Sequence, residues 1–405
     1  MAEPILRQII LHRFRSLPSE QVTFDNPTFL VGQNGSGKSN FVDAFAFLAE
    51  AMVSPLQAVL EHRGGFATVG YRSSARSRPS NLGLSVVLEN LDSDTPRARY
   101  AFELRARRDY GFEVVHEQCV VQKSDGSRDW FDRSTSPKGS AISWKSKGDS
   151  LEPVMEPSSL ALPLIGGDAR FQAVSRFLSE MRVYRIDPTS LRTMQDPDGG
   201  VHLRSDGSNT ASVLRDIQRE SPDTWKRILD LLESIVPGTV GVHPKKHGNK
   251  LTLEFTQNWA QPKPVKFEAF NMSDGTLRAL GLFAAIFQRA APSLLVIEEP
   301  EATIHPGALG TTLDALRHAG RFMQVVVTTH SPDVLDAKWI ENRHLRIASW
   351  EKGATYISRV SPATRIALSE HLMGAGELFR SNALTPADLF EQNSSRPELF
   401  EEDLP

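Results

Sequence analysis

The amino-acid sequence predicts an α/β protein with a mixed sheet core, an N-terminal antiparallel sheet and a mainly helical lobe. Three observations support this fold class. Segments in the first third alternate apolar and polar residues, as half-buried antiparallel strands do. Segments in the middle place apolar residues at helical spacing. In the last third, helical segments alternate with short apolar runs, which is typical of a parallel sheet covered by helices.

The composition excludes several classes of protein. With 405 residues, 40% of them hydrophobic and 23% charged, the chain resembles an ordinary soluble globular protein. It contains no apolar run near the ~20 residues of a membrane helix and no secretory signal pattern. A single cysteine, Cys119, excludes an internal disulfide framework. These features predict a cytoplasmic protein without a membrane partner, and the net charge of −3 gives no global case for nucleic-acid binding.

The first third is predicted to consist mostly of strands around one helix. Turn signals separate the short apolar runs, and the helix has phenylalanine and leucine along one side. The strands are expected at 5–14, 21–24, 28–31, 84–91, 98–107 and 112–122, and the helix at 40–52.

The middle of the chain changes character. Residues 123–160 are rich in Ser, Lys, Asp, Gly and Pro, which favours an exposed excursion. Helices are then expected at 170–181, 208–219 and 221–236, followed by a hairpin at 240–255.

The last third alternates helices and strands. We expect helices at 273–289 and 308–319, each preceding a strand, at 294–297 and 324–328. The acidic end of the chain is expected to be mobile. The sequence predicts one composite unit, 1–405, which has four parts. They are 1–122 (the glycine-loop lobe with antiparallel strands), 123–270 (an inserted, mainly helical region), 271–370 (the part that contains Ser273, Glu299 and His330) and 371–405 (the C-terminal tail).

A glycine-rich loop lies between the strand at 28–31 and the helix that follows it. Residues 32–39 match G-x-x-x-x-G-K-[ST] in full. In this pattern, backbone N–H groups surround a phosphate, Lys38 adds a positive charge, and the Ser39 hydroxyl is suited to bind Mg²⁺. A plain Gly/Ser loop is the simpler explanation, but the flanking strand and helix favour an ATP site with Mg²⁺. Its predicted residues are Gly32, Asn34, Gly35, Ser36, Gly37, Lys38, Ser39 and Asn40.

Two carboxylates follow the apolar run at 294–297. A buried parallel strand brings acidic residues to the edge of the sheet where ligands bind. Glu298 is predicted to hold Mg²⁺, and Glu299 to orient the water that attacks the γ-phosphate. The simpler alternative is a solvated strand end. A metal-hydrolase site of Glu298, Glu301 and His305 is also possible by spacing.

Two further elements appear at separations along the sequence that suit an ATP site. His330 follows the second apolar strand and is predicted to contact the γ-phosphate, although a lone histidine at a strand end is usually an ordinary surface residue. Ser273, Asp274 and Gly275 begin a helix before the carboxylates. A helix cap explains them most simply, but Ser and Gly at a helix N-terminus also form an anion cradle.

Together these motifs resemble the RecF/SMC-like branch of the ABC-type ATPases. The likeness is greatest to stand-alone bacterial AAA-family ATPases of the AAA-21 type, including those of anti-phage defence modules. It rests on FLVGQNGSGKSNFVDAFAFL, FNMSDGTLRALGLFAAI, LLVIEEPEATIHPGAL and VVVTTHSPDVLD. The resemblance implies an ABC-type ATPase head that forms a homodimer around two ATP molecules. Ser273, Asp274 and Gly275, which correspond to the signature motif of that family, would then face the ATP of the other subunit.

The sequence departs from the wider family pattern in three places. Glu298 stands where aspartate is commoner, and Ser-Asp-Gly-Thr replaces the transporter-type Ser-Gly-Gly-Gln. No glutamine among Gln57, Gln118 and Gln172 has the context of the loop glutamine that reaches Mg²⁺. Only short helices lie between the glycine loop and the signature, which excludes a long coiled-coil arm.

The sequence leaves the biological role open between two classes. The first is a DNA-directed ATPase, either a RecF-like repair protein or the ATPase subunit of a defence complex with a separate nuclease effector. Basic segments at 72–78, 105–108 and 245–250 motivate duplex DNA as a partner, although a solvated basic face is the simpler explanation. The second is an ATP-gated regulator of a protein partner, with the acidic tail and residues 123–160 as docking elements.

Overall fold

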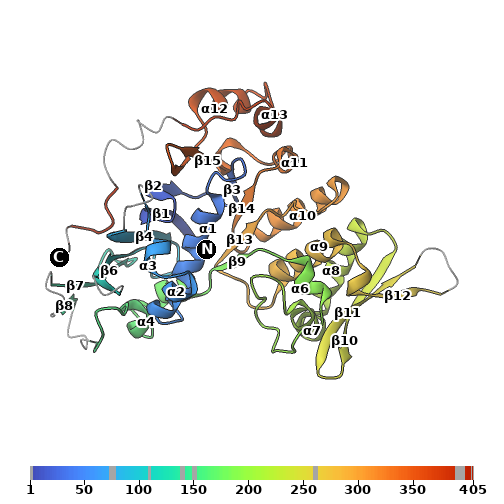
Figure 1. Ribbon diagram of the computed structural model, residues 1–405, viewed down its shortest axis with the longest axis horizontal. Helices are drawn as coiled ribbons and strands as arrows, with labels where there is room; N and C mark the ends of the chain where they lie inside the picture. Colours follow the sequence, from blue (N-terminus) through green and yellow to red (C-terminus); the bar gives the residue numbers. More distant parts are fainter. Residues whose placement is uncertain are drawn as a thin grey trace. The chain divides into compact units, whose positions relative to one another are not determined.

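The computed structural model describes residues 3–72, 79–107, 111–136, 142–147, 153–258, 263–387, 397–402 and 404. Its contacts group the chain into two units (Figure 1). The first contains residues 1–181, 341–372 and 382–405, and the second contains residues 182–340 and 373–381. These boundaries differ from the predicted ones at 122, 270 and 370. Part of the predicted tail therefore belongs to each unit.

A seven-stranded sheet forms most of the first unit, in the order β2-β1-β4-β5-β6-β7-β8. Every neighbouring pair in it is antiparallel, so the predicted N-terminal antiparallel sheet is confirmed. Figure 1 shows its strands in blue to green. The strands are β1 (Ile5–Phe14), β2 (Leu17–Thr23), β4 (Asn81–Glu89), β5 (Arg97–Ala106), β6 (Phe112–Gln122), β7 (Arg128–Thr135) and β8 (Ile142–Ser146).

Strands β7 and β8 correct the expectation that residues 123–160 form an exposed excursion. The buried side of β7 carries Asp129, Phe131, Arg133 and Thr135, and three of these residues are polar. A strand with mostly polar residues on its inner side lacks the hydrophobic alternation by which strands are recognised. The prediction was therefore wrong here because a polar residue was taken to be an exposed one.

The inward-facing Arg133 belongs to a buried polar network. Its Nη1 lies 3.7 Å from the Glu117 carboxylate, and neither side chain is exposed. Glu117 also accepts hydrogen bonds from the Tyr100 hydroxyl at 2.9 Å and from the N–H groups of Ala161 and Leu162, at 2.6 and 2.9 Å. A buried charge is tolerated only when it is paired and hydrogen-bonded in this way. The network ties β5, β6 and β7 to the segment that begins α4 (Leu162–Ile165).

Helix α1 (Lys38–Ala51) packs within the first unit through phenylalanine side chains. Phe41 and Phe45 contact each other and Phe24, whereas Phe47 contacts Phe14 of β1. All five rings are at most 1% exposed. Burying each ring contributes about 1.5–3 kcal/mol, so α1 is firmly held against the strands around it.

A second set of strands in the first unit supports the loop that precedes α1. Strand β3 (Thr28–Val31) is parallel to β15 (Leu345–Glu351), which pairs antiparallel with β16 (Ala354–Ser358). The sequence did not predict β15 or β16. The other helices of this unit are α2 (Leu56–His62), α3 (Phe66–Val69), α5 (Gln172–Ser179), α12 (Pro362–Ser369) and the 3₁₀ helix η2 (Asn342–His344).

The second unit combines three parallel strands with a mainly helical lobe. Strand β13 (Leu294–Glu298) is parallel to β14 (Gln324–Thr329) and to β9 (Arg182–Tyr184). Helices α9 (Asp274–Phe287) and α10 (Pro306–Ala319) precede β13 and β14, as predicted.

The lobe also contains helices and a small sheet. The helices are α6 (Pro188–Arg192), α7 (Thr210–Glu220), α8 (Pro222–Ile235), α11 (Pro332–Leu335), α13 (Ala375–Arg380) and the 3₁₀ helix η1 (Ala269–Asn271). The sheet, in the order β10-β11-β12, contains β10 (Thr239–His247), β11 (Lys250–Gln257) and β12 (Val265–Glu268). The longest helices that the structure describes have 14 residues. None of them is long and apolar enough to cross a bilayer.

The buried Glu20 on β2 leads to a prediction about stability. Its Oε2 accepts a hydrogen bond from the Ile357 N–H at 2.9 Å. Burial raises the pKa of this carboxyl from 4.5 to about 8, against the effect of that hydrogen bond. Between pH 4.5 and about pH 8, the carboxyl is ionised only in the unfolded chain. The native state therefore binds more protons, and the free energy of unfolding falls as pH rises.

Glu20→Gln should remove this loss because glutamine stays neutral and keeps an acceptor for Ile357. The variant's free energy of unfolding should exceed that of the wild type by a margin that grows by about 1.4 kcal/mol per pH unit, up to about pH 8. Urea unfolding at several pH values measures this margin, with the exposed Glu370→Gln as control. A margin that does not change with pH would contradict the prediction.

Candidate functional site

The glycine loop is held in place by close approaches that only glycine permits. A Cβ on Gly32 would lie 2.4 Å from the Ala348 carbonyl oxygen on β15. A Cβ on Gly37, whose φ is +92°, would lie 1.8 Å from the Thr355 hydroxyl on β16. Gly35 also has a positive φ of +79°, but no atom lies within 4 Å of its Cβ position. The loop is thus pressed against β15 and β16 on one side and open at Gly35.

Lys38 and Ser36 show what this loop is suited to hold. Lys38 is 6% exposed, and its ammonium donates to the carbonyl oxygens of Gly32 and Gln33, at 2.7 and 3.0 Å. The Ser36 hydroxyl is buried without a hydrogen-bond partner among the described residues. The N-cap residue of α1 is Gly37, which has no side chain to cap the helix. A helix N-terminus that begins at a glycine, a buried lysine and a Ser36 hydroxyl unpaired among the described residues together suit a phosphate.

The remaining predicted loop residues divide into two groups. Asn34, Gly35 and Ser39 are exposed on the loop and the first turn of α1. Asn40, in contrast, donates to the Ser16 hydroxyl at 2.8 Å, and Ser16 in turn lies 2.7 Å from the Thr355 hydroxyl. In this structure Asn40 therefore supports the loop through its neighbours.

The predicted carboxylates and His330 belong to the second unit. Strands β13 and β14 are in parallel register, with Glu298 opposite Thr328. The next residue, Glu299, has a φ of +46°, which is uncommon for a residue with a side chain. Its N–H donates to the Thr328 carbonyl at 3.0 Å and to the Thr328 hydroxyl at 3.2 Å. Such a conformation costs about 1–3 kcal/mol and is commonest at functional sites.

This turn brings Glu299 and His330 together. The Nδ1 atom of His330 lies 3.2 Å from Glu299 Oε1 and 3.7 Å from Glu301 Oε1, without hydrogen-bond geometry to either. Both Glu299 and His330 keep over a third of their side chains exposed, whereas Glu301 is 9% exposed. The structure thus places the two predicted catalytic residues side by side at the end of the parallel strands.

Glu301 is a site residue that the sequence analysis considered only as a metal ligand. Its Oε1 accepts hydrogen bonds from the Thr329 hydroxyl at 2.7 Å and from the His330 N–H at 3.2 Å. It therefore connects the loop after β13 to the loop after β14. The third acid of Glu-Glu-Pro-Glu was the available signal.

Arg278 on α9 is a second residue that the sequence analysis missed. Its Nη2 donates to the carbonyl oxygens of Glu298 and Glu299, at 3.3 and 3.1 Å. Burial lowers the pKa of this guanidinium, while the charges of Glu301 and Glu299 oppose that effect. An arginine inside the apolar segment 277–287 was the signal, because a buried charge needs partners.

The predicted signature residues form the N-terminus of α9. Ser273 is the cap, and its hydroxyl accepts from the Thr276 N–H at 3.2 Å. Asp274 forms an ion pair with Arg192. A Cβ on Gly275 would lie 2.6 Å from the Thr303 carbonyl oxygen, so glycine is required where α9 meets the loop after β13. Ser273 itself is exposed, and a role in a second subunit's site stays a prediction.

The alternative metal-hydrolase site is not formed. His305 instead caps α10, with its Nδ1 accepting from the Gly307 N–H at 3.1 Å. Across the described part of the chain, no group of three His, Cys, Asp or Glu side chains is arranged to hold a metal ion.

Comparisons with known proteins show the family and the fold of this chain. Residues 28–336 match the model of the family described as "AAA domain, putative AbiEii toxin, Type IV TA system". The match begins at β3 and ends just after α11, so it includes every predicted site residue. The chain belongs to this family. No curated protein matches the sequence.

Solved structures of SMC heads share the fold of this AAA-domain protein. An Smc head bound to the C-terminal winged-helix domain of ScpA is 13% identical, with a TM-score of 0.56, and the match covers 89% of this chain and 99% of that one. An Smc head with an extended coiled coil from Pyrococcus furiosus, also bound to ScpA, is 11% identical with a TM-score of 0.53, and covers 91% and 99%. One with a coiled coil and joint from Pyrococcus yayanosii is 10% identical with a TM-score of 0.51, and covers 91% and 100%.

These findings confirm the predicted resemblance to RecF/SMC-like ABC-type ATPases and the predicted fold class. The AAA-domain protein therefore has an ATPase fold that supports ATP binding and hydrolysis. Its glycine loop lies in the first unit and its carboxylates and His330 in the second.

The contacts of Glu301 lead to a prediction about turnover. Glu301→Gln replaces a carboxylate oxygen by an amide group and weakens the hydrogen bonds to Thr329 and His330. We expect the rate of ATP hydrolysis to fall about 10- to 100-fold, with little change in ATP affinity. Steady-state kinetics and calorimetry measure the two quantities. The exposed Glu233→Gln in the same unit serves as control and should behave like the wild type. An equal loss of affinity and rate would show that Glu301 is needed for binding instead.

Proposed function

We propose that this protein binds ATP with Mg²⁺ and hydrolyses it, and that two copies close head to head around the nucleotide. The main support is the pairing of Glu299 with His330 at the end of the parallel strands, 3.2 Å apart and both solvent-accessible. A carboxylate and an imidazole in contact suit the orientation of a water molecule and the contact with a terminal phosphate.

Each predicted residue has a stated role in this proposal. The glycine loop and Lys38 bind the phosphates, since Lys38 is buried and the Ser36 hydroxyl has no hydrogen-bond partner in the described part of the chain. The Ser39 hydroxyl and the Glu298 carboxylate supply oxygen ligands of the kind that Mg²⁺ prefers. When bound, the metal ion neutralises phosphate charge. Glu299 polarises the attacking water, and His330 contacts the γ-phosphate.

Lys38→Ala tests nucleotide binding directly. The substitution removes the only charge in the loop, together with the ammonium that donates to the carbonyls of Gly32 and Gln33. We expect ATP affinity to fall at least about 100-fold, because a charge-assisted contact to phosphate contributes several kcal/mol. Calorimetry with Mg·ATP measures this loss, and the exposed Arg365→Ala is the control. Unchanged affinity in Lys38→Ala would refute the phosphate-loop assignment.

Dimerisation is proposed because Ser273 and Gly275 lie at the exposed N-terminus of α9. In the ABC-type family that the chain resembles, the corresponding residues of one head face the ATP of the other. ATP would then bind the closed pair better than the open one, and the two events would be coupled. Hydrolysis through Glu299 would release the pair.

Glu299→Gln should separate dimer closure from hydrolysis. Glutamine cannot act as the base, so ATP should accumulate in the closed dimer. Sizing with light scattering should show a dimer with Mg·ATP and a monomer without nucleotide. The double variant Lys38→Ala/Glu299→Gln, which should stay monomeric with ATP, is the control. A Glu299→Gln protein that is monomeric with saturating ATP would contradict the head-to-head arrangement.

A nuclease encoded beside this gene should co-purify with the trapped form.

For the biological role, we propose the ATPase subunit of a DNA-directed or anti-phage defence complex, with cutting done by a separate nuclease effector. The family description, which names a toxin of a type IV toxin–antitoxin system, supports a module of this kind. A RecF-like repair ATPase is the alternative within the same class, with duplex DNA as its partner.

The regulator of a protein partner is a second candidate, favoured by two observations. Lys245 pairs with Glu254 and Glu268, and Lys250 pairs with Asp196, so the basic hairpin is largely neutralised by its own unit. Arg105 pairs with Glu113, whereas residues 73–78 and 108 lie outside the described residues. The second observation is the contact that the acidic C-terminal segment makes with the antiparallel sheet.

A further inference from the structure

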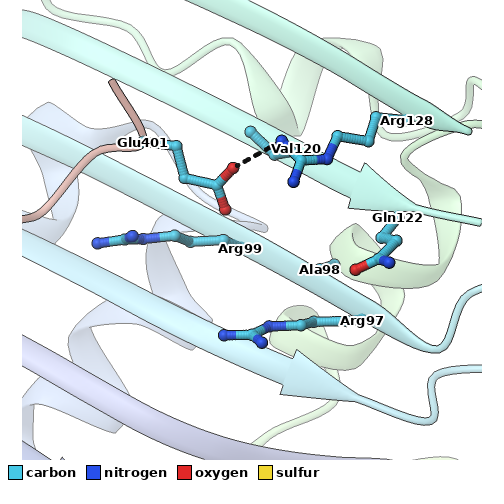
Figure 2. A pocket seen from close by; sticks show the side chains of 7 residues that line it. All are labelled: Arg97, Ala98, Arg99, Val120, Gln122, Arg128 and Glu401. Atoms are coloured by element: carbon cyan, nitrogen blue, oxygen red, sulfur yellow. Dashed lines mark ion pairs between the residues drawn. The ribbon is translucent and has the colours of Figure 1, made fainter. Parts of the chain in front are cut away.

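The outer face of the antiparallel sheet carries a group of arginines. Arg97 and Arg99 on β5 lie opposite Gln122 and Val120 of β6, and Gln122 lies opposite Arg128 of β7. These residues share one face of the sheet and line a pocket of about 330 Å³ (Figure 2). The opposite face carries apolar residues such as Tyr100 and Phe102, which belong to the buried core.

The C-terminal segment Pro397–Glu402 lies across this arginine-bearing face. The side chain of Gln118 on β6 binds the main chain of this segment through both the N–H and the oxygen of its amide. Gln118 Nε2 donates to the Glu401 carbonyl at 3.1 Å, and the Glu401 N–H donates to Gln118 Oε1 at 2.8 Å. A side-chain amide that pairs with one N–H and one C=O acts like the edge of a neighbouring strand, and it recognises a peptide main chain.

Two apolar side chains of the segment have matching positions on the sheet. Leu399 is 6% exposed and lies so close to Gly83 that a Cβ there would be 2.3 Å from its Cδ1. The Phe400 ring stacks on His116, with the centroids 3.8 Å apart and the planes at 27°. The His116 ring is itself oriented by Asp132, at 2.7 Å. The sheet thus accommodates a leucine over a glycine and an aromatic ring on a histidine.

The charges of the segment complement the arginines. The Glu401 carboxylate lies 3.7 Å from Arg128 Nη1, as the dashed line in Figure 2 marks. Arg99 donates to the Glu398 carbonyl and to the Ser85 hydroxyl. Burial lowers the pKa of the Arg99 guanidinium, and the charge of Glu401 is the largest opposing influence. Partly buried arginines gain from an acidic neighbour in this position.

The segment leaves room on the same face. Glu401 forms one wall of the 330 Å³ pocket, and Arg97 lies in that pocket without an ion pair among the described residues. A second hollow of about 770 Å³ is lined by residues that include Trp130, Lys147 and Glu402. A ligand with a longer acidic chain than this segment would therefore find unfilled space and an available arginine.

We propose that this face of the sheet is a binding site for an extended peptide with the order apolar–aromatic–acidic. Residues 397–402 of this chain are its resident ligand and occupy it until a partner protein's peptide of the same chemistry displaces them. Gln118 forms hydrogen bonds with the peptide main chain. Gly83 and His116 contact the two apolar side chains. Arg99 and Arg128 attract the acidic side chain. A nucleic acid fits less well, because a phosphodiester backbone has no N–H group for the Gln118 carbonyl.

In the full chain, Phe400→Ala/Glu401→Lys should release the segment and open the site. A fluorescent peptide of residues 396–405 should then bind this variant at least about tenfold more tightly than it binds the wild type, where the attached segment competes at high effective concentration. Adding Gln118→Ala should abolish the gain. Fluorescence anisotropy measures all three affinities.

The controls distinguish specific recognition of the peptide from non-specific binding. The same peptide carrying both substitutions should not bind, and the exposed Arg365→Glu on α12 should leave the affinity of the opened variant unchanged. A labelled DNA duplex is the competing ligand. Duplex binding to the opened variant without peptide binding would overturn the proposal in favour of a polyanion site. Equal peptide affinity for the opened variant and its Gln118→Ala form would overturn it as well.

A second measurement does not require the double variant to fold. In the otherwise unchanged chain, Gln118→Ala alone should loosen the segment, because both main-chain hydrogen bonds are lost. Hydrogen exchange at the Glu401 amide should accelerate about tenfold or more, in line with the loss of about 1.4 kcal/mol or more of local stability. The same exchange rate in the wild type and Gln118→Ala would refute the recognition role of Gln118.

Discussion

The burial of α1 is the constraint on which the first unit depends. Its phenylalanines interlock with Phe14 of β1 and with Phe24, so the helix cannot shift without opening the core. The glycine loop is continuous with this helix, and Gly37 is pressed against Thr355 of β16 at its first turn. Loop and helix are therefore held from both sides. A phosphate-binding loop benefits from this rigidity, because its N–H groups must already point at the ligand when it arrives.

In the second unit, the corresponding element is the turn at Glu299. Its left-handed backbone is stabilised from one side by Thr328 and from the other by Arg278, which holds two consecutive carbonyls. Glu301 then links the same loop to His330. Gly275 brings the N-terminus of α9 against the carbonyl of Thr303, which itself has a φ of +64°. The carboxylates, His330 and the signature residues are thus connected by hydrogen bonds and close contacts. A shift in one of these loops would therefore displace the others.

The antiparallel sheet has different tasks on its two faces. One face packs into the core and carries the buried Glu117–Arg133 network, whereas the other carries arginines and receives the C-terminal segment. This arrangement suits a reversible cover, which is the physical basis of the proposed peptide site.

The sequence by itself determined the local elements, the glycine loop and the identity of most site residues. These depend on patterns that are short in sequence: hydrophobic periodicity, a strand before a Gly-rich turn, and acids after an apolar run. Only the tertiary structure decided the roles of Arg278, Glu301 and Asn40, because their partners lie far along the chain or across a loop. It also revealed β7, β15 and β16 and the docked C-terminal segment. β15 pairs with the distant β3, and β7 has mostly polar residues on its buried side, so hydrophobic alternation along the chain does not reveal their burial. Arg133 or Glu401 looks like solvent-exposed charge until its partner is known.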